Sequence, residues 1–206
     1  MSQLTRTTLL LLGLAALLLV FPALADDEKK PAAGEGYDPA AMEEAWNKAR
    51  MPGENHQFLA GMEGEWTYTS TMWMNPSQPP MESSGESTKT MIMGGRYLQE
   101  ETTGEFQGEP FNGRGVTAYD NNTGEFVSTW IDNMGTGVMV SRGQRDGDEL
   151  TLRGEFLDPM SRQMMKLKTV TRVVDKDKHV FEYYMTIPEM GEVKQMEIVY
   201  VRKGGE

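Results

Sequence analysis

The chain contains no cysteine among its 206 residues. This excludes disulfides, thiol nucleophiles and cysteine-ligated metal sites, so the hydrophobic core must stabilise the fold. Histidine is also scarce, with only His56 and His179. Neither belongs to a Ser-His-Asp order, a Gly-x-Ser-x-Gly elbow or a His-Glu-x-x-His motif. Our first interpretation is therefore that the chain has no catalytic residue, no metal site and no bound cofactor.

Basic residues are few, with 20 Lys and Arg against 31 Asp and Glu, and the formal net charge is −11. Nucleic acids and anionic membranes are bound through clustered Lys and Arg side chains. This charge balance therefore argues against both as partners.

A long hydrophobic run occurs only near the N-terminus, from Leu9 to Phe21. It is shorter than the ~20 residues that a membrane span requires. Arg6 precedes the run, and Ala23-Leu24-Ala25 fits the small-x-small rule for signal peptidase. The sequence therefore predicts a signal peptide over residues 1–25, cut after Ala25, and a periplasmic or secreted protein with no membrane attachment after cleavage.

The rest of the chain is expected to form one domain behind a short leader. Residues 26–37 are rich in Lys, Pro, Gly and Glu, which predicts disorder. Residues 38–206 form the predicted domain. Asp38-Pro39 is typical of a helix start, and a helix to Arg50 is expected, followed by a short helical piece over 54–61.

From Glu65 onward the hydrophobic period changes to two, which indicates β-strands separated by tight turns. An antiparallel meander of this length removes its exposed edges by closing into a barrel. The sequence therefore predicts an all-β, ten-stranded, up-and-down barrel with a short N-terminal helix and room for a ligand. The ten strands are expected over residues 65–74, 84–93, 96–106, 113–120, 125–132, 135–145, 149–157, 163–174, 179–187 and 192–202.

Five short motifs carry a likeness to a known family. They are His56-x-x-Leu59 before Gly64-x-Trp66, Gly95-Arg96-Tyr97-Leu98-x-Glu100, Phe111-x-Gly113-x-Gly115-x-x-x-Tyr119-Asp120, Thr129 to Gly137, and Tyr200-x-Arg202. On these motifs the chain resembles the bacterial family called domain of unknown function 1579, which is placed among the calycin-like barrels. The resemblance implies a calycin-like barrel closed by Gly64, Trp66 and Arg202, with the guanidinium lying across the indole. It implies no activity.

The favoured function is binding of a small, mostly apolar molecule by an exported monomer or weak homodimer. Trp130 lies beside Asp132 in the longest motif, and an aromatic ring with a nearby acid can line a pocket or anchor the sheet. The candidate pocket residues are Trp130, Asp132, Tyr119, Met134 and Arg96.

Two other functions stay open. The first is an enzyme that uses Asp132, Asp120 or Glu100 together with Arg96 inside the barrel. The second is a haem or copper protein. His179 is the only axial-ligand candidate near the barrel body, although the preceding Asp-Lys-Asp-Lys run predicts that it is exposed.

Methionine is abundant, at 17 residues. Met72-x-Met74 and Met91-x-Met93 would each place two thioethers on one strand face, where they could bind Cu(I). Methionine also fills cores and adaptable cavities, which is the interpretation we favour for these residues.

Overall fold

The computed structural model describes residues 38–74 and 78–204. The predicted signal peptide and leader, residues 1–37, lie outside the described residues. Two helices precede ten strands. The elements are α1 (Pro39–Arg50), α2 (Glu54–Ala60), β1 (Gly64–Met72), β2 (Met81–Ile92), β3 (Tyr97–Phe106), β4 (Glu109–Asp120), β5 (Glu125–Asp132), β6 (Met139–Asp146), β7 (Glu149–Leu157), β8 (Met164–Asp175), β9 (Lys178–Ile187) and β10 (Gly191–Arg202).

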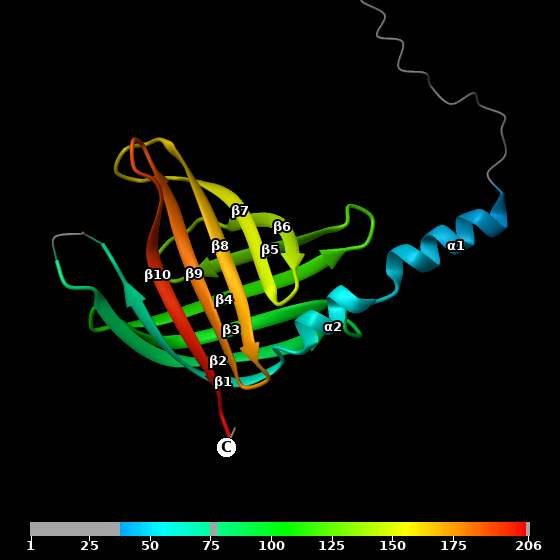
Figure 1. The fold of residues 1–206 in the computed structure, drawn as a ribbon, viewed down its shortest axis with the longest axis horizontal. Coiled ribbons are helices and arrows are strands. Elements are labelled where there is room, and N and C mark those ends of the chain that lie inside the picture. The colour runs from blue at the N-terminus through cyan, green and yellow to red at the C-terminus, as the bar shows by residue number, and fades with distance from the viewer. Residues whose placement is uncertain (1–37, 75–77, 205–206) are drawn as a thin grey trace, which may run out of the picture. The chain divides into compact units, whose positions relative to one another are not determined.

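The ten strands form a closed antiparallel barrel in which each strand pairs with its neighbours in sequence and β1 pairs with β10 (Figure 1). The closing register places Trp66 opposite Arg202 and Tyr68 opposite Tyr200. The predicted ten-stranded up-and-down barrel is therefore confirmed. Closure pairs both edges of the meander and leaves no open strand edge.

Three strands begin three or more residues away from the predicted start. β4 begins at Glu109 and not at Gly113, because Gln107 and Gly108, both with positive φ, form a two-residue turn that pairs Phe106 with Glu109. β2 begins at Met81, directly after Pro80, because the strand can start as soon as a residue with a backbone N–H is available. β6 begins at Met139 and not at Gly135. The carboxylate of Asp132 accepts the backbone N–H of Met134 at 3.0 Å, so a turn follows β5 directly where the prediction placed the start of β6.

The helices form as the sequence predicts. The side chain of Asp38 accepts the N–H of Ala40 at 3.0 Å, which caps α1. Helix α2 buries His56 and Leu59. Leu59 and Met62 pack against inward-facing residues of the barrel to form the main core cluster, together with Leu98, Phe126, Leu150 and Leu152. The α2 segment therefore closes one end of the barrel (Figure 1).

The opposite end of the barrel is the one at which β1 ends and β2 begins, at Met72 and Met81. We call it the open end, because neither of the two described helices packs against it. Neither of the two helices described is long and apolar enough to cross a membrane.

Candidate functional site

Trp66 and Arg202 meet at the closed end of the barrel. Trp66 is 1% exposed, and its indole N–H donates to the carbonyl of Met62 at 3.0 Å. The guanidinium of Arg202 lies 4.2 Å from the centre of the indole ring. It also donates to the carbonyls of Gly61 and Glu63, at the end of α2. Arg202 on β10 therefore contacts both the residues that follow α2 and Trp66 on β1.

Gly64 makes this arrangement possible. Its φ is 133°, a backbone conformation that residues other than glycine rarely adopt. A Cβ at this position would also overlap the Nη1 of Arg202. The three residues that the resemblance implies as the closing group thus lie in contact.

A buried polar cluster lies in the barrel interior next to this closed end. Glu100 on β3 is at its centre. The Oε1 atom of Glu100 accepts hydrogen bonds from Ser87 at 2.8 Å, Thr102 at 3.2 Å and Tyr200 at 3.2 Å. The same atom forms an ion pair with the Nζ of Lys89 at 3.4 Å. Four donors from β2, β3 and β10 thus converge on one carboxylate oxygen.

The other oxygen of Glu100 differs in its surroundings. Among the described residues, none donates a hydrogen bond to Oε2. The Glu100 side chain is 20% exposed, whereas that of Lys89 is 6% exposed. Because Glu100 lies opposite Lys89 and Gly115 in register, it faces the barrel interior. This oxygen is therefore the acceptor that the cluster leaves available to a molecule inside the barrel.

Lys89 connects Glu100 to His179. Its Nζ lies 2.9 Å from the Nε2 of His179 and 4.2 Å from the centre of the Tyr200 ring. Burial lowers the pKa of Lys89, and the carboxylate of Glu100 opposes that shift. Burial, with added repulsion from Lys89 and Arg202, lowers the pKa of His179 to about 2. His179 is therefore neutral and accepts at Nε2.

The rings around Lys89 hold it in place. His179 stacks on Tyr200 with ring centres 4.5 Å apart and meets the edge of Trp66 at 4.4 Å. Burial, followed by the charge of Glu100, raises the pKa of Tyr200 well above its ordinary value. The phenol therefore stays protonated and acts as a hydrogen-bond donor to Glu100.

The interior above the cluster changes in character toward the open end. Strand register and alternation define which side chains face inward. A middle zone carries small hydroxyl side chains, namely Ser70, Thr117, Ser128, Ser141, Thr169 and Thr171. The apolar side chains of Ile198 and Phe181 lie between Ser70 and Thr171 in this zone. The zone nearest the open end is apolar and includes Met72, Met81, Phe106, Met139, Phe156, Met165, Tyr183, Met185 and Met196. All nine residues of the apolar zone are half-buried.

Glycines in the barrel wall let aromatic rings lie flat against it. A Cβ at Gly113 would overlap the Trp130 ring, and one at Gly115 would lie 2.9 Å from it. Tyr68 covers Gly85 in the same way, with its hydroxyl 2.6 Å from the position of a Cβ there. Because these rings lie along the wall, they take up less of the interior than rings that project from it.

The pocket residues expected from the sequence are only partly brought together. The indole N–H of Trp130 donates to Asp132 at 2.9 Å, and both face inward. Met134 lies in the following turn and is 53% exposed. Tyr119 faces inward but packs on Phe126 at the helical end. Trp130 and Asp132 therefore belong to the interior wall, and Tyr119 to the core beside α2.

Arg96 lies in the β2–β3 hairpin. Its Nη1 donates to the carbonyls of Met93 and Gly94 within the same turn. Asp120 accepts the N–H of Asn122 at 2.8 Å in the β4–β5 turn, and this hydrogen bond lowers its pKa. Of the acids proposed to act with Arg96, Glu100 does join a buried cluster, but its cationic partner is Lys89.

The sequence expectation that His179 is exposed is wrong, because the residue is 1% exposed. The side chain follows a turn, yet it lies at an inward position opposite Tyr200. Its Nε2 is occupied by Lys89, and its Nδ1 is enclosed without a partner among the described residues. The residue therefore does not fit as an axial haem ligand.

The expected thioether pairs are also separated. Met74 lies beyond the end of β1 and is 66% exposed. Met91 packs against the core cluster, whereas Met93 is 70% exposed in a turn. No group of three or more His, Asp or Glu that could hold a metal ion occurs within residues 38–74 and 78–204.

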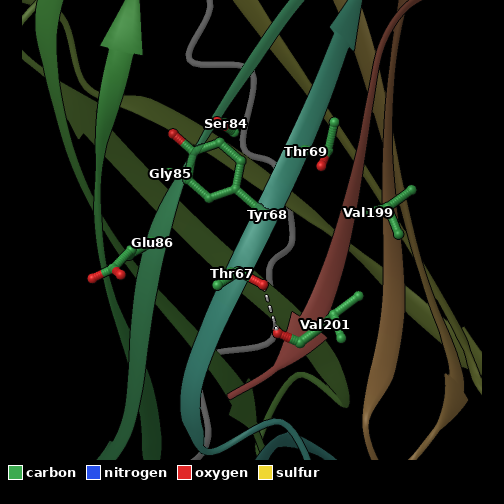
Figure 2. Close-up of a pocket in the computed structure, with 8 residues that line it drawn as sticks. All are labelled: Thr67, Tyr68, Thr69, Ser84, Gly85, Glu86, Val199 and Val201. Atoms are coloured by element: carbon green, nitrogen blue, oxygen red, sulfur yellow. Dashed lines mark hydrogen bonds between the residues drawn. The ribbon is translucent and has the colours of Figure 1, made fainter. Parts of the chain in front are cut away.

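A separate groove of about 420 Å³ lies on the outer wall over β2, β1 and β10 (Figure 2). Within it, Thr67 of β1 donates to the carbonyl of Val201 of β10 at 3.3 Å. Its one carboxylate, Glu86, is paired with Lys203 at 2.7 Å. The groove offers hydroxyl groups from Thr67, Thr69 and Ser84 and one carboxylate that is already paired. It holds no buried charge such as Lys89, so the interior cluster is the stronger candidate site.

Comparison with known proteins identifies the family. The sequence matches the family described as "Protein of unknown function (DUF1579)" over residues 51–202. The chain belongs to this family. The match spans α2 and all ten strands. No curated protein matches the chain significantly.

Solved structures are similar to this chain at low sequence identity. The crystal structure of Rv2717c from M. tuberculosis is 18% identical, with a TM-score of 0.54, and the match covers 74% of this chain and 99% of that one. The S-type phycobiliprotein lyase CPES from Guillardia theta is 11% identical, with a TM-score of 0.49 and coverage of 78% and 98%. The first of these establishes a common barrel fold.

Proposed function

We propose that this protein binds a small, mostly apolar molecule inside the barrel, with one hydrogen-bond donor of that molecule directed at Glu100. The observation that carries this proposal is the asymmetry of the Glu100 carboxylate. Four donors saturate Oε1, whereas Oε2 has no donor among the described residues and the side chain is partly exposed.

The gradient of side chains supports the chemical class of the ligand. Apolar residues surround the open end, hydroxyl groups line the middle, and the charged cluster lies at the closed end. Lys89 and Glu100 neutralise each other, so the cluster offers an acceptor without a large net charge. A ligand with an apolar body and a hydroxyl or amine at one end would match this order.

The N-terminal sequence supports a location outside the cytoplasm. We propose that the protein is exported and that the exported form begins at Asp26, after removal of the predicted signal peptide. Mass spectrometry of the exported protein tests this directly. A start at Met1 would contradict it.

Substitutions in β5 test whether binding occurs in the interior. Ser128 faces inward and Thr129 faces outward on the same strand. We expect Ser128→Phe to fill the interior and abolish binding of an apolar fluorescent probe, whereas Thr129→Phe leaves it unchanged. Equal binding by both variants, with both folded by circular dichroism, would place the ligand elsewhere.

Two matched ligands test the role of Glu100. 1-Decanol carries a hydroxyl donor, and decyl methyl ether lacks it while keeping a similar apolar chain. A hydrogen bond to a charged acceptor contributes about 1.5–3 kcal/mol. The alcohol should therefore displace the probe at a concentration at least about tenfold lower than the ether requires. Equal displacement by the two compounds would remove Glu100 from the proposal while leaving interior binding intact.

A further inference from the structure

Three methionines on three adjacent strands, β2, β1 and β10, lie side by side at the open end of the barrel. Met72 on β1 is directly opposite Met81 on β2 and directly opposite Met196 on β10. Residues paired in this way point to the same face of the sheet, with Cβ atoms about 4.5–5.5 Å apart. We call Met72, Met81 and Met196 the thioether triad. All three side chains are half-buried and face the interior.

Two members of the triad, Met72 and Met81, border an open space. A hollow of about 290 Å³ is lined by Met72, Met81 and Phe106, among others. The sulfur of Met81 already accepts a weak contact from the side-chain amide of Gln107, at 3.6 Å. This sulfur therefore points to a region that a small ion can reach, and is not enclosed in a packed core.

From this geometry we propose that the thioether triad binds a soft monovalent cation, Cu(I) in the first instance. Thioethers are soft, neutral ligands that select Cu(I) over hard cations such as Mg²⁺ or Ca²⁺. Flexible methionine side chains on three adjacent strands can turn their sulfurs toward a common point in front of Met72. The formal charge of −11 favours the approach of a cation.

Thiol and imidazole groups do not compete for the ion. The chain has no cysteine. His56 is 4% exposed and accepts the N–H of Gly53 through Nδ1, and His179 is 1% exposed and bound to Lys89. Cation binding through the triad should therefore involve sulfur without imidazole.

Three other inward-facing methionines of the barrel serve as a control for the triad. Met139, Met165 and Met185 also face inward, but their register partners are not methionines. Met139 is opposite Trp130, Met165 is opposite Phe156, and Met185 is opposite Leu167 and Val193. These three residues have the same side chain and the same general exposure as the triad, but no neighbouring thioether across the strand.

The test is a titration of the purified protein with Ag(I), a redox-stable substitute for Cu(I), followed by Cu(I) in competition with a chromophoric chelator. Replacing the triad by leucine (M72L, M81L and M196L together) should weaken binding by about tenfold or more. The control variant M139L, M165L and M185L should bind as the unmodified protein does. Leucine preserves apolar volume, so both variants should fold.

Two further readouts identify the ligands. X-ray absorption of the Cu(I) complex should give a first shell of sulfur only. Affinity should be the same at about pH 5 and about pH 8, because thioethers do not titrate, whereas an imidazole site would weaken on acidification. The proposal is overturned if the triad variant keeps its affinity within about threefold, if the control variant loses as much, or if nitrogen dominates the first shell.

Discussion

Replacing Gly64 by alanine should separate the contributions of backbone strain and of Arg202 to barrel closure. Gly64 has a φ of 133°, and a side chain there would overlap the guanidinium that lies on Trp66. Gly64→Ala therefore has two consequences. The backbone must adopt an unfavourable conformation, and Arg202 must move away from its carbonyl and indole partners.

The magnitudes follow from these two effects. A non-glycine residue held in a sparsely populated conformation costs about 1–3 kcal/mol. Moving Arg202 loses a cation–π contact of about 0.5–2 kcal/mol and weakens charged hydrogen bonds to the carbonyls of Gly61 and Glu63. Because the Arg202 side chain is 24% exposed, the second effect is taken as about 2 kcal/mol. Gly64→Ala should thus destabilise the protein by about 3–5 kcal/mol.

Urea unfolding of a double-mutant cycle measures the two effects separately. In an Arg202→Ala background the overlap is gone, so Gly64→Ala should cost only the backbone strain of about 1–3 kcal/mol. The expected coupling between the two positions is therefore about 2 kcal/mol. If Gly64→Ala costs the same with and without Arg202, the guanidinium has no part in the requirement for glycine, and the reasoning is refuted.

Three further outcomes are expected. Trp66→Ala should destabilise the fold by about 3–5 kcal/mol in urea unfolding, as for a buried aromatic, and a loss below about 1 kcal/mol would remove its closing role. His179 has a folded-state pKa of about 2 and an unfolded value of about 6.5. Its contribution to stability is therefore complete above about pH 6.5 and is lost as pH falls toward 2, by up to about 1.4 kcal/mol per pH unit. The free energy of unfolding, measured from about pH 6 to pH 4, should therefore depend less on pH in His179→Phe than in the unmodified protein. An unchanged slope would show that another group dominates. Gly113→Ala should push the Trp130 ring into the interior and weaken probe binding in a displacement assay, and unchanged affinity would show that the bound molecule does not reach this part of the interior.

The sequence was sufficient to predict the barrel because its main features are local. Alternation with period two, tight turns such as Asn121 to Gly124, and the absence of helical segments after Gly61 together indicate an antiparallel meander. Adjacent strands in such a meander pair with each other, so the topology follows once closure is assumed. The family resemblance, through Gly64, Trp66 and Arg202, further predicted that the first and last strands meet at these residues.

The interior cluster could not be predicted in the same way. Lys89 lies among serines and threonines in β2, in a stretch typical of a solvated strand, and its partner His179 is 90 residues away. The charged run before His179 obscured its inward position, although alternation with Phe181 and Tyr183 was a usable signal. Only the closure of β1 on β10 and the register across five strands, from β9 to β3, bring Lys89, Glu100 and His179 together.

The pairing of Met72 with Met81 and Met196 has the same origin. Sequence spacing drew attention to methionines two residues apart on one strand, such as Met72 and Met74. The structure instead aligns methionines across strands, because register depends on hairpin length and on the bulge between Lys194 and Met196. Cross-strand neighbours cannot be read from spacing within a single strand.

Native mass spectrometry of the protein purified from its own exported fraction tests the central claim most directly. The unmodified protein and Thr129→Phe should each retain an adduct of small-molecule mass, and Ser128→Phe, whose new ring occupies the barrel interior, should not. Absence of an adduct from all three proteins, or an equal adduct on Ser128→Phe, would contradict binding of a small molecule inside the barrel.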